Sequence, residues 1–169
     1  MTHIIEPHGG TLSDLLVLGK QGSRIREESI HLPSLTLNDR HLCDLEMLLN
    51  GSFSPLTGFL TQKDYDSVVS DLHLSDGTLW PIPITLDVDK EFSNDISSGD
   101  KIVLRDHEGV ALAVMTISDI WIPNKVNEAE QVYGTQDADH PAVDYLLNQS
   151  GEVYIGGKLE GLELPRHYD

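Results

Sequence analysis

Hydrophobic residues recur at helical spacing in the segment Asp39–Asn50. The apolar positions on the shared face are Leu42, Leu45, Leu48 and Leu49. Asn38 before this run is a favourable N-cap, and Gly51 after it supplies a stop. The pattern therefore predicts an amphipathic helix from about Asp39 to Asn50.

A second helix is predicted to begin after Thr61, which can cap it together with Asp64 three residues further on. Its expected buried positions are Val68, Val69 and Leu72. Between the two helices, Gly51–Phe59 reads GSFSPLTGF, and its glycines, proline and aromatic residues predict a tight loop packed by its own side chains. The GxSxG spacing of a nucleophilic serine is not met there, so we interpret the loop as structural.

The period changes to two between Trp80 and Val88, where apolar residues alternate with Pro81, Pro83, Thr85 and Asp87. This alternation predicts a half-buried strand. Both prolines remove hydrogen-bond donors from the same side of the strand, which favours a position at a sheet edge.

Further elements follow towards the C-terminal end. Two apolar runs on either side of Asp106–Gly109 predict a hairpin. We expect two short helices and then a last strand. The two runs of the hairpin are Ile102–Leu104 and Val110–Ile117. The predicted helices are Asn127–Tyr133 and Pro141–Asn148, and the predicted strand is Glu152–Leu159.

The first 35 residues read as a lead-in with less regular patterning. Leu12, Leu15, Leu16 and Leu18 predict a short amphipathic helix, and Gly19–Ser23 predicts a mobile stretch around Gly22. We therefore expect a lead-in at 1–35 and one folded domain at 36–169. No βαβ alternation with a glycine-rich first turn occurs, so the fold class is α+β, with a small mixed sheet or barrel and peripheral helices.

The charge of the chain limits the classes of partner that it is expected to bind. The 169 residues contain 28 Asp and Glu against 11 Lys and Arg, so the formal net charge is −17. An acidic surface repels phosphates, which argues against binding to nucleic acids or membrane surfaces. The single cysteine, Cys43, lies between leucines and is expected to be a buried thiol in a reducing compartment. Without an apolar run long enough for a signal or a membrane span, the chain is expected to be cytoplasmic.

Candidate chemistry is sparse. Gly151 and Gly156 have the spacing of a phosphate-binding loop, but Gly157 replaces the lysine and Leu159 the serine or threonine, so a close-packed strand is the better interpretation. Asp87 and Asp89 could form an acid/base pair, but they lie where a strand leaves the core, so a solvated strand end explains them better.

The densest group of possible metal ligands is Asp137, Asp139 and His140. It directly precedes Pro141, so capping of the next helix explains it better than metal binding. The other histidines have no ligand spacing, and the five arginines are spread too widely to converge on a transferring phosphoryl group. The residues alone thus indicate no catalytic, cofactor or metal site.

Five segments carry a family resemblance. They are PHGGTL at Pro7–Leu12, LCDLEMLLNGSFSPLTGFL at Leu42–Leu60, DGTLWPIPITLDV at Asp76–Val88, DHPAVDYL at Asp139–Leu146 and YIGGKLEG at Tyr154–Gly161. Together they resemble the N-terminal, PUA-like domain of the sulfate adenylyltransferases (ATP sulfurylases), with the fungal assimilatory type most similar. The resemblance implies a PUA-like β-barrel or mixed sheet with helices around it.

The resemblance also implies a reaction in the parent enzyme, which joins ATP and sulfate to give adenosine 5′-phosphosulfate and pyrophosphate in sulfate assimilation. Magnesium would accompany the nucleotide there. The family's catalytic signatures, QxRNPxHxxH and GRDxAG, do not occur in this sequence. We therefore carry over no catalytic or binding residue and expect this chain alone to be inactive, with the catalytic domain absent and no cofactor bound.

The implied role is structural. The expected partners are the catalytic domain of the same enzyme and further copies in a homo-oligomer, with the SFSPLTGF loop and the HPAVDYL helix as candidate contact surfaces. PUA-like modules that bind RNA, or a ligand of their own, are the alternatives. The lack of a lysine and arginine cluster speaks against RNA.

Overall fold

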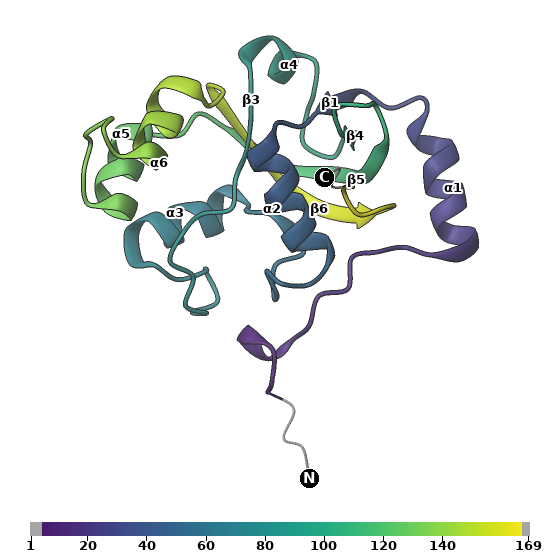
Figure 1. The fold of residues 1–169 in the computed structure, drawn as a ribbon, viewed down its shortest axis with the longest axis horizontal. Helices are drawn as coiled ribbons and strands as arrows, with labels where there is room; N and C mark the ends of the chain where they lie inside the picture. Colours follow the sequence, from purple (N-terminus) through teal and green to yellow (C-terminus); the bar gives the residue numbers. More distant parts are fainter. Residues whose placement is uncertain (1–4, 167–169) are drawn as a thin grey trace. The chain divides into compact units, whose positions relative to one another are not determined.

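The computed structural model describes residues 5–166. The parts of the expected domains that cover residues 1–4 and 167–169 lie outside this description. The described chain contains six α-helices and a six-stranded mixed sheet with strand order β1-β4-β5-β6-β2, in which β2 is the short strand Gly58–Phe59 (Figure 1). Strand β3 lies off this path and pairs with β6. The α+β class expected from the sequence is confirmed.

The chain divides into two compact units, each built from separate stretches of sequence. The first unit contains Met1–Gly58, Gly99–Ile117 and Gly157–Asp169, and the second contains Phe59–Ser98 and Ser118–Gly156. The long strands β5 (Ala111–Trp121) and β6 (Val153–Gly161) contribute residues to both units.

The first unit contains a hairpin that the sequence predicted. Strand β4 (Lys101–Arg105) pairs antiparallel with β5, and Ile102 lies opposite Met115. Strand β1 (Ser34–Thr36), which the sequence reading missed, adds to β4 in parallel. The turn ends at Gly109, whose φ of 84° lies in the left-handed region that glycine adopts without strain.

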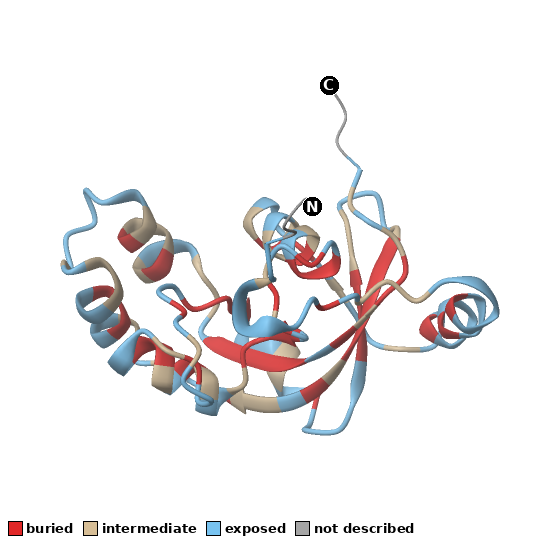
Figure 2. Cartoon of the chain, turned by 90° about the horizontal axis from the view of Figure 1, so that it is seen from below, coloured by how far each residue is buried: buried red, intermediate tan, exposed pale blue. Residues whose placement is uncertain are grey.

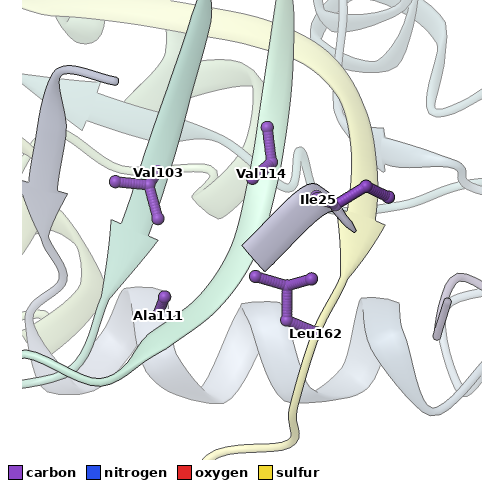
Figure 3. Close-up of a cluster of buried hydrophobic side chains, with 5 residues drawn as sticks. All are labelled: Ile25, Val103, Ala111, Val114 and Leu162. Atoms are coloured by element: carbon purple, nitrogen blue, oxygen red, sulfur yellow. The ribbon is translucent and has the colours of Figure 1, made fainter. Parts of the chain in front are cut away.

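A compact apolar cluster holds this unit together. Its buried side chains come from helix α1 (Gly19–Ser29), β4, β5 and the residue after β6, and they are Ile25, Val103, Ala111, Val114 and Leu162 (Figure 3). Val17 and Leu32 pack against the cluster. Helix α1 is therefore attached to the sheet through Ile25 and not only through its chain connections.

Helix α2 (Asp39–Leu49) has the predicted bounds and cap. The Asn38 side chain accepts a hydrogen bond from the backbone N–H of His41 at 2.9 Å. Leu45, Leu48 and Leu49 are buried, and buried and exposed residues lie on opposite sides of the helices (Figure 2). Cys43 is exposed, so the expected buried thiol is wrong, because Cys43 lies off the buried face of the helix.

The predicted position of the helix within the lead-in is also wrong. Residues Leu12–Leu18 are extended, and Leu16 forms a parallel bridge with Gly161. The helix is instead α1 (Gly19–Ser29), and Gly22 is buried within it. A Cβ on Gly22 would lie 2.2 Å from the carbonyl oxygen of Val17, so this glycine allows a close packing contact where the sequence suggested mobility.

The second unit begins with helix α3 (Gln62–Asp71), capped by Thr61 as predicted. The Thr61 hydroxyl accepts from Asp64 N–H at 3.3 Å and donates to Asp64 Oδ2 at 3.1 Å. Leu72 was expected to be buried but is 41% exposed, because the helix ends there in a left-handed conformation.

The predicted strand between Trp80 and Val88 is much shorter than expected. Only Leu86–Val88 forms β3, which pairs antiparallel with β6. The alternating pattern was misleading, since Ile82 is exposed whereas Thr85 and Asp87 are buried. A short helix, α4 (Lys90–Asn94), follows and is capped by Asp89.

The remaining helices agree with the sequence. Helix α5 (Lys125–Glu128) continues into a π-helical segment, Ala129–Tyr133, and α6 (Pro141–Asp144) continues into another, Tyr145–Gln149. These helical segments and α3 contact one another (Figure 1). No helix in the described part of the chain has the length and apolar character needed to cross a membrane.

Candidate functional site: a buried polar cluster in the second unit

Ionisable side chains are buried in the second unit, where a solvated surface was expected. Glu128, the last residue of α5, is 3% exposed, and Asp87 in β3 is 7% exposed. Burying a carboxylate is costly unless hydrogen bonds replace the lost water. The partners of these two groups therefore decide what the cluster can do.

Glu128 is held by two tyrosines from distant elements. Its Oε2 accepts hydrogen bonds from the hydroxyl of Tyr65 at 2.8 Å and from that of Tyr154 at 3.2 Å. The N-cap Asn124 starts α5 one turn before Glu128, and the buried face of α3 directs Tyr65 inwards. Glu128 thus connects α5 to both α3 and β6.

An aromatic group surrounds this carboxylate. The ring centroids of Tyr65, Trp121 and Tyr154 lie 5.5 to 5.8 Å apart. Tyr154 meets both of the others nearly edge to face, a geometry that the ring quadrupoles favour. The Nε1 atom of Trp121 is buried and has no hydrogen-bond partner among the described residues.

The electrostatics of the cluster argue against acid/base chemistry by its tyrosines. Burial, and next the charge of Glu128, raise the pKa of Tyr65 and of Tyr154 far above the usual tyrosine range. Both hydroxyls therefore stay protonated at neutral pH and act as hydrogen-bond donors.

Asp87 and Lys125 fix the beginning of β6. Asp87 Oδ2 accepts from the backbone N–H of Gly151 at 2.6 Å. Lys125 Nζ donates to the Ser150 carbonyl at 3.0 Å and to its hydroxyl at 2.7 Å. Burial lowers the pKa of Lys125, while the charges of Asp87, Glu128 and Glu152 oppose that shift.

Taken together, these side chains make their hydrogen bonds to other groups of the second unit. Their contacts join β3, α3, α5 and β6, which are the elements on which the second unit depends. An arrangement of this kind resists unfolding and fixes geometry, and it presents neither an activated nucleophile nor converging cations.

The sequence favoured a solvated strand end at Asp87 and Asp89, which is correct for Asp89 and wrong for Asp87. Asp89 is exposed and caps α4, accepting from Phe92 N–H at 2.7 Å. Asp87 is buried, because the residues on both sides of β3 are covered. The two carboxylates have different partners, so they form no acid/base pair.

The Asp137, Asp139 and His140 group serves local structure. Asp139 N–H donates to Asp137 Oδ1 at 2.9 Å, His140 occupies the N-cap position of α6, and its ring contacts that of Tyr133. Among residues 5–166, no group of three or more histidine, cysteine, aspartate or glutamate side chains is arranged to hold a metal ion.

The glycines near the C-terminal end lie in a close-packed strand, as the sequence analysis favoured. In the second unit, a Cβ on Gly156 would lie 2.0 Å from the carbonyl oxygen of Leu60. In the first unit, a Cβ on Gly157 would lie 2.1 Å from that of Thr116. Both glycines belong to β6 and permit close contact between backbones, which leaves no phosphate-binding loop there.

The SFSPLTGF loop is a structural loop. Ser54 is buried, and its Oγ donates to the Gly51 carbonyl at 2.5 Å while accepting from Ser13 N–H at 2.9 Å. Leu56 and Phe59 are buried as well, so the loop offers less apolar surface to a partner than expected. In the HPAVDYL helix, Val143 and Leu146 are buried and the other residues are at least partly accessible.

Sequence reasoning did not identify Glu128, Tyr65, Trp121 and Tyr154 as a group. A glutamate at the end of a short polar helix has the pattern of a surface residue, and the spacing within each element carries no sign of its distant partners. Two buried aromatic residues with polar tips, Trp121 and Tyr154, were the only local hint that a polar partner lies nearby.

Comparison with known proteins finds relatives among the fungal sulfate adenylyltransferases. A sulfate adenylyltransferase of Eremothecium gossypii is 46% identical over 98% of this chain, one of Saccharomyces cerevisiae 48% over 96%, and one of Candida albicans 51% over 96%. The chain spans about a third of the length of each of these relatives, at 33%, 32% and 33%.

A solved structure described as a hexameric APS kinase from Thiobacillus denitrificans has a similar fold. Its TM-score is 0.75 at 35% identity, and the match covers 98% of this chain and 28% of that one.

The six helices and the mixed six-stranded sheet of the described residues define an α+β domain. The family model for the PUA-like domain matches residues 5–164. The chain therefore belongs to the PUA-like domain family.

Proposed function

We propose that this chain is the N-terminal domain of a sulfate adenylyltransferase. The observation that carries the proposal is the identity of 46% to 51% to three fungal sulfate adenylyltransferases over almost the whole chain. The match corresponds to the N-terminal third of those proteins. The full-length enzyme would convert ATP and sulfate to adenosine 5′-phosphosulfate and pyrophosphate.

Within that enzyme the domain acts as a scaffold. Its buried carboxylates and tyrosines, and the half-buried Lys125, are engaged in internal hydrogen bonds, which supports a structural role and speaks against a role in binding phosphate or sulfate. The binding of Mg-ATP and the reaction belong to the catalytic domain. No catalytic, cofactor-binding or metal-binding residue is assigned to this chain, and it has no activity by itself.

The catalytic domain of the same enzyme is the main partner. The fold is shared with a protein described as a hexameric APS kinase, which supports a homo-oligomeric assembly for the full-length protein. A soluble metabolic enzyme of this kind works in the cytoplasm.

The isolated chain allows a direct test. Sulfate-dependent release of pyrophosphate from ATP should be undetectable with the purified chain, while the full-length Saccharomyces cerevisiae relative under the same conditions provides the positive control. The reverse reaction, ATP formation from adenosine phosphosulfate and pyrophosphate, should be equally silent. Turnover by the isolated chain that depends on sulfate would contradict the scaffold assignment.

A further inference from the structure

Asn50 and Gly51 form the only Asn-Gly pair in the sequence. An asparagine followed by glycine is chemically labile, because glycine has no side chain to hinder attack by its own backbone nitrogen. That nitrogen attacks the Asn50 side-chain Cγ, a new C–N bond forms and ammonia leaves, giving a cyclic imide. Water then opens the ring to aspartate or isoaspartate, so no oxidant or other co-reactant is needed.

The native structure opposes this attack at the attacking atom and at the carboxamide. The Gly51 N–H donates to the Leu48 carbonyl at 3.3 Å, which closes the end of α2. The Asn50 side-chain oxygen accepts from Ser52 N–H at 2.9 Å, which holds the carboxamide in one orientation. The Asn50 side chain itself is exposed, so water has access to it and restraint alone provides the protection.

Gly51 is further fixed by its surroundings in the first unit. Its φ is 82°, and a Cβ on it would lie 2.8 Å from the Ser13 carbonyl oxygen. Its own carbonyl accepts from the backbone N–H of Ser54 at 3.0 Å and from the Ser54 hydroxyl. The glycine cannot rotate towards Asn50 without breaking these contacts.

We propose that Asn50 is a conformation-gated deamidation site, protected while the end of α2 and the following loop are closed, and modified when that segment opens. Modification is then irreversible in its effect. Isoaspartate inserts a methylene group into the main chain beside the fixed Gly51, so the loop cannot close again. Aspartate places a negative charge at the C-terminal end of α2, where the helix dipole disfavours it.

The test measures deamidation at each asparagine by peptide mapping and mass spectrometry after incubation in mildly alkaline buffer. The unfolded chain in concentrated urea should deamidate at Asn50 more than about tenfold faster than the native chain, since only open molecules react. Asn148, which precedes Gln149, serves as an internal reference for slow deamidation. A native rate at Asn50 within about twofold of the unfolded rate would overturn the proposal.

Two variants test the gate itself. Ser54→Ala removes the side-chain hydrogen bonds to Gly51 and Ser13, so it should raise the native rate at Asn50 several-fold and leave the unfolded rate unchanged. Ser52→Ala, an exposed substitution in the same loop, should change neither rate. If hydrogen exchange shows that Ser54→Ala opens the loop while the native rate stays at the wild-type value, the gate is contradicted. If Ser54→Ala does not fold, the deamidation rates of Asn50 in the native and the unfolded wild-type chain still test the proposal.

Discussion

Glu128 is a buried carboxylate whose hydrogen bonds link three elements of the second unit. A buried carboxylate that loses a partner keeps the cost of its desolvation without the compensating hydrogen bond. The two tyrosine hydroxyls replace water for this group, and their rings add apolar burial around it. The cluster is therefore stabilising only while it is complete.

Tyr65→Phe should lower the free energy of unfolding by about 1.5–3 kcal/mol, the usual cost of removing a hydrogen bond to a charged group. The ring packing against Trp121 and Tyr154 is kept, so the hydroxyl alone is tested. Tyr145→Phe is the matched control, because the Tyr145 hydroxyl lies 3.5 Å from Asp87 and should contribute less. Urea unfolding checks both, and equal losses in the two variants would contradict the special role of Glu128.

Stability should also fall in alkaline solution because of the same hydroxyls. The pKa of Tyr65 and of Tyr154 is raised in the folded chain, so the unfolded state loses these protons first, from about pH 10 upwards. Their stabilising contribution is complete below that pH and is lost as the pH rises towards the folded values, by up to about 1.4 kcal/mol per pH unit for each group.

Comparison of the wild-type chain with a Tyr65→Phe, Tyr154→Phe variant isolates this effect. The difference in unfolding free energy between the two chains should shrink steadily above about pH 10 in urea titrations. Burial lowers the pKa of Lys125, so the contribution of this residue to stability rises with pH. Both chains contain Lys125, and its effect therefore cancels from the difference between them. A difference that stays constant with pH would show that these tyrosines ionise as readily in the folded chain.

At the scale of elements, helix α1 shows how a close contact overrides local preference. Gly22 lies inside the helix, where glycine costs about 1 kcal/mol relative to alanine. Its place is explained by the Val17 carbonyl, which lies only 2.2 Å from the position a Cβ would take. Packing of the backbone of α1 against the preceding segment therefore outweighs helix propensity.

Gly22→Ala should accordingly destabilise the chain by about 1–3 kcal/mol, although propensity alone predicts a gain. Ser23→Ala at the adjacent, exposed position should be neutral or slightly stabilising, because it raises propensity without meeting another atom. Thermal unfolding of both variants provides the measurement. A higher melting temperature for Gly22→Ala than for wild type would refute the close approach.

The elements that the sequence predicted share a local cause. Helices α2 and α3 have caps and periodic apolar faces within one stretch of chain, and the hairpin of β4 and β5 has its turn residues between two apolar runs. These features are decided by neighbours in sequence, so a pattern reveals them.

The failures share a cause as well. The exposure of Leu12 and Ile82, and the burial of Asp87 and Glu128, depend on contacts with residues far away in sequence. Alternation around Trp80–Val88 suggested a strand with one buried and one exposed face. Strand β3 is instead covered on both sides, and Asp87 accepts a hydrogen bond from the Gly151 N–H. The candidate cluster, which joins β3, α3, α5 and β6, could not be assembled from any one of their patterns.

At the scale of the whole molecule, we propose that the chain has a supporting role in a larger enzyme. The chain carries a PUA-like domain over residues 5–164 and spans about a third of the sulfate adenylyltransferases that it matches. Its buried polar groups serve folding, and its formal net charge of −17 makes it a poor surface for phosphate-rich partners.

A chimera tests this assignment most directly. The corresponding N-terminal third of the Saccharomyces cerevisiae relative is replaced by this chain, and the purified chimera is assayed for ATP formation from adenosine phosphosulfate and pyrophosphate. A second chimera carrying Val103→Asp, which places a charge in the apolar cluster of the first unit, is the control. We expect the first chimera to form ATP in this assay and the second chimera to lose most of that activity. A well-folded first chimera without activity, or turnover by this chain alone, would contradict it.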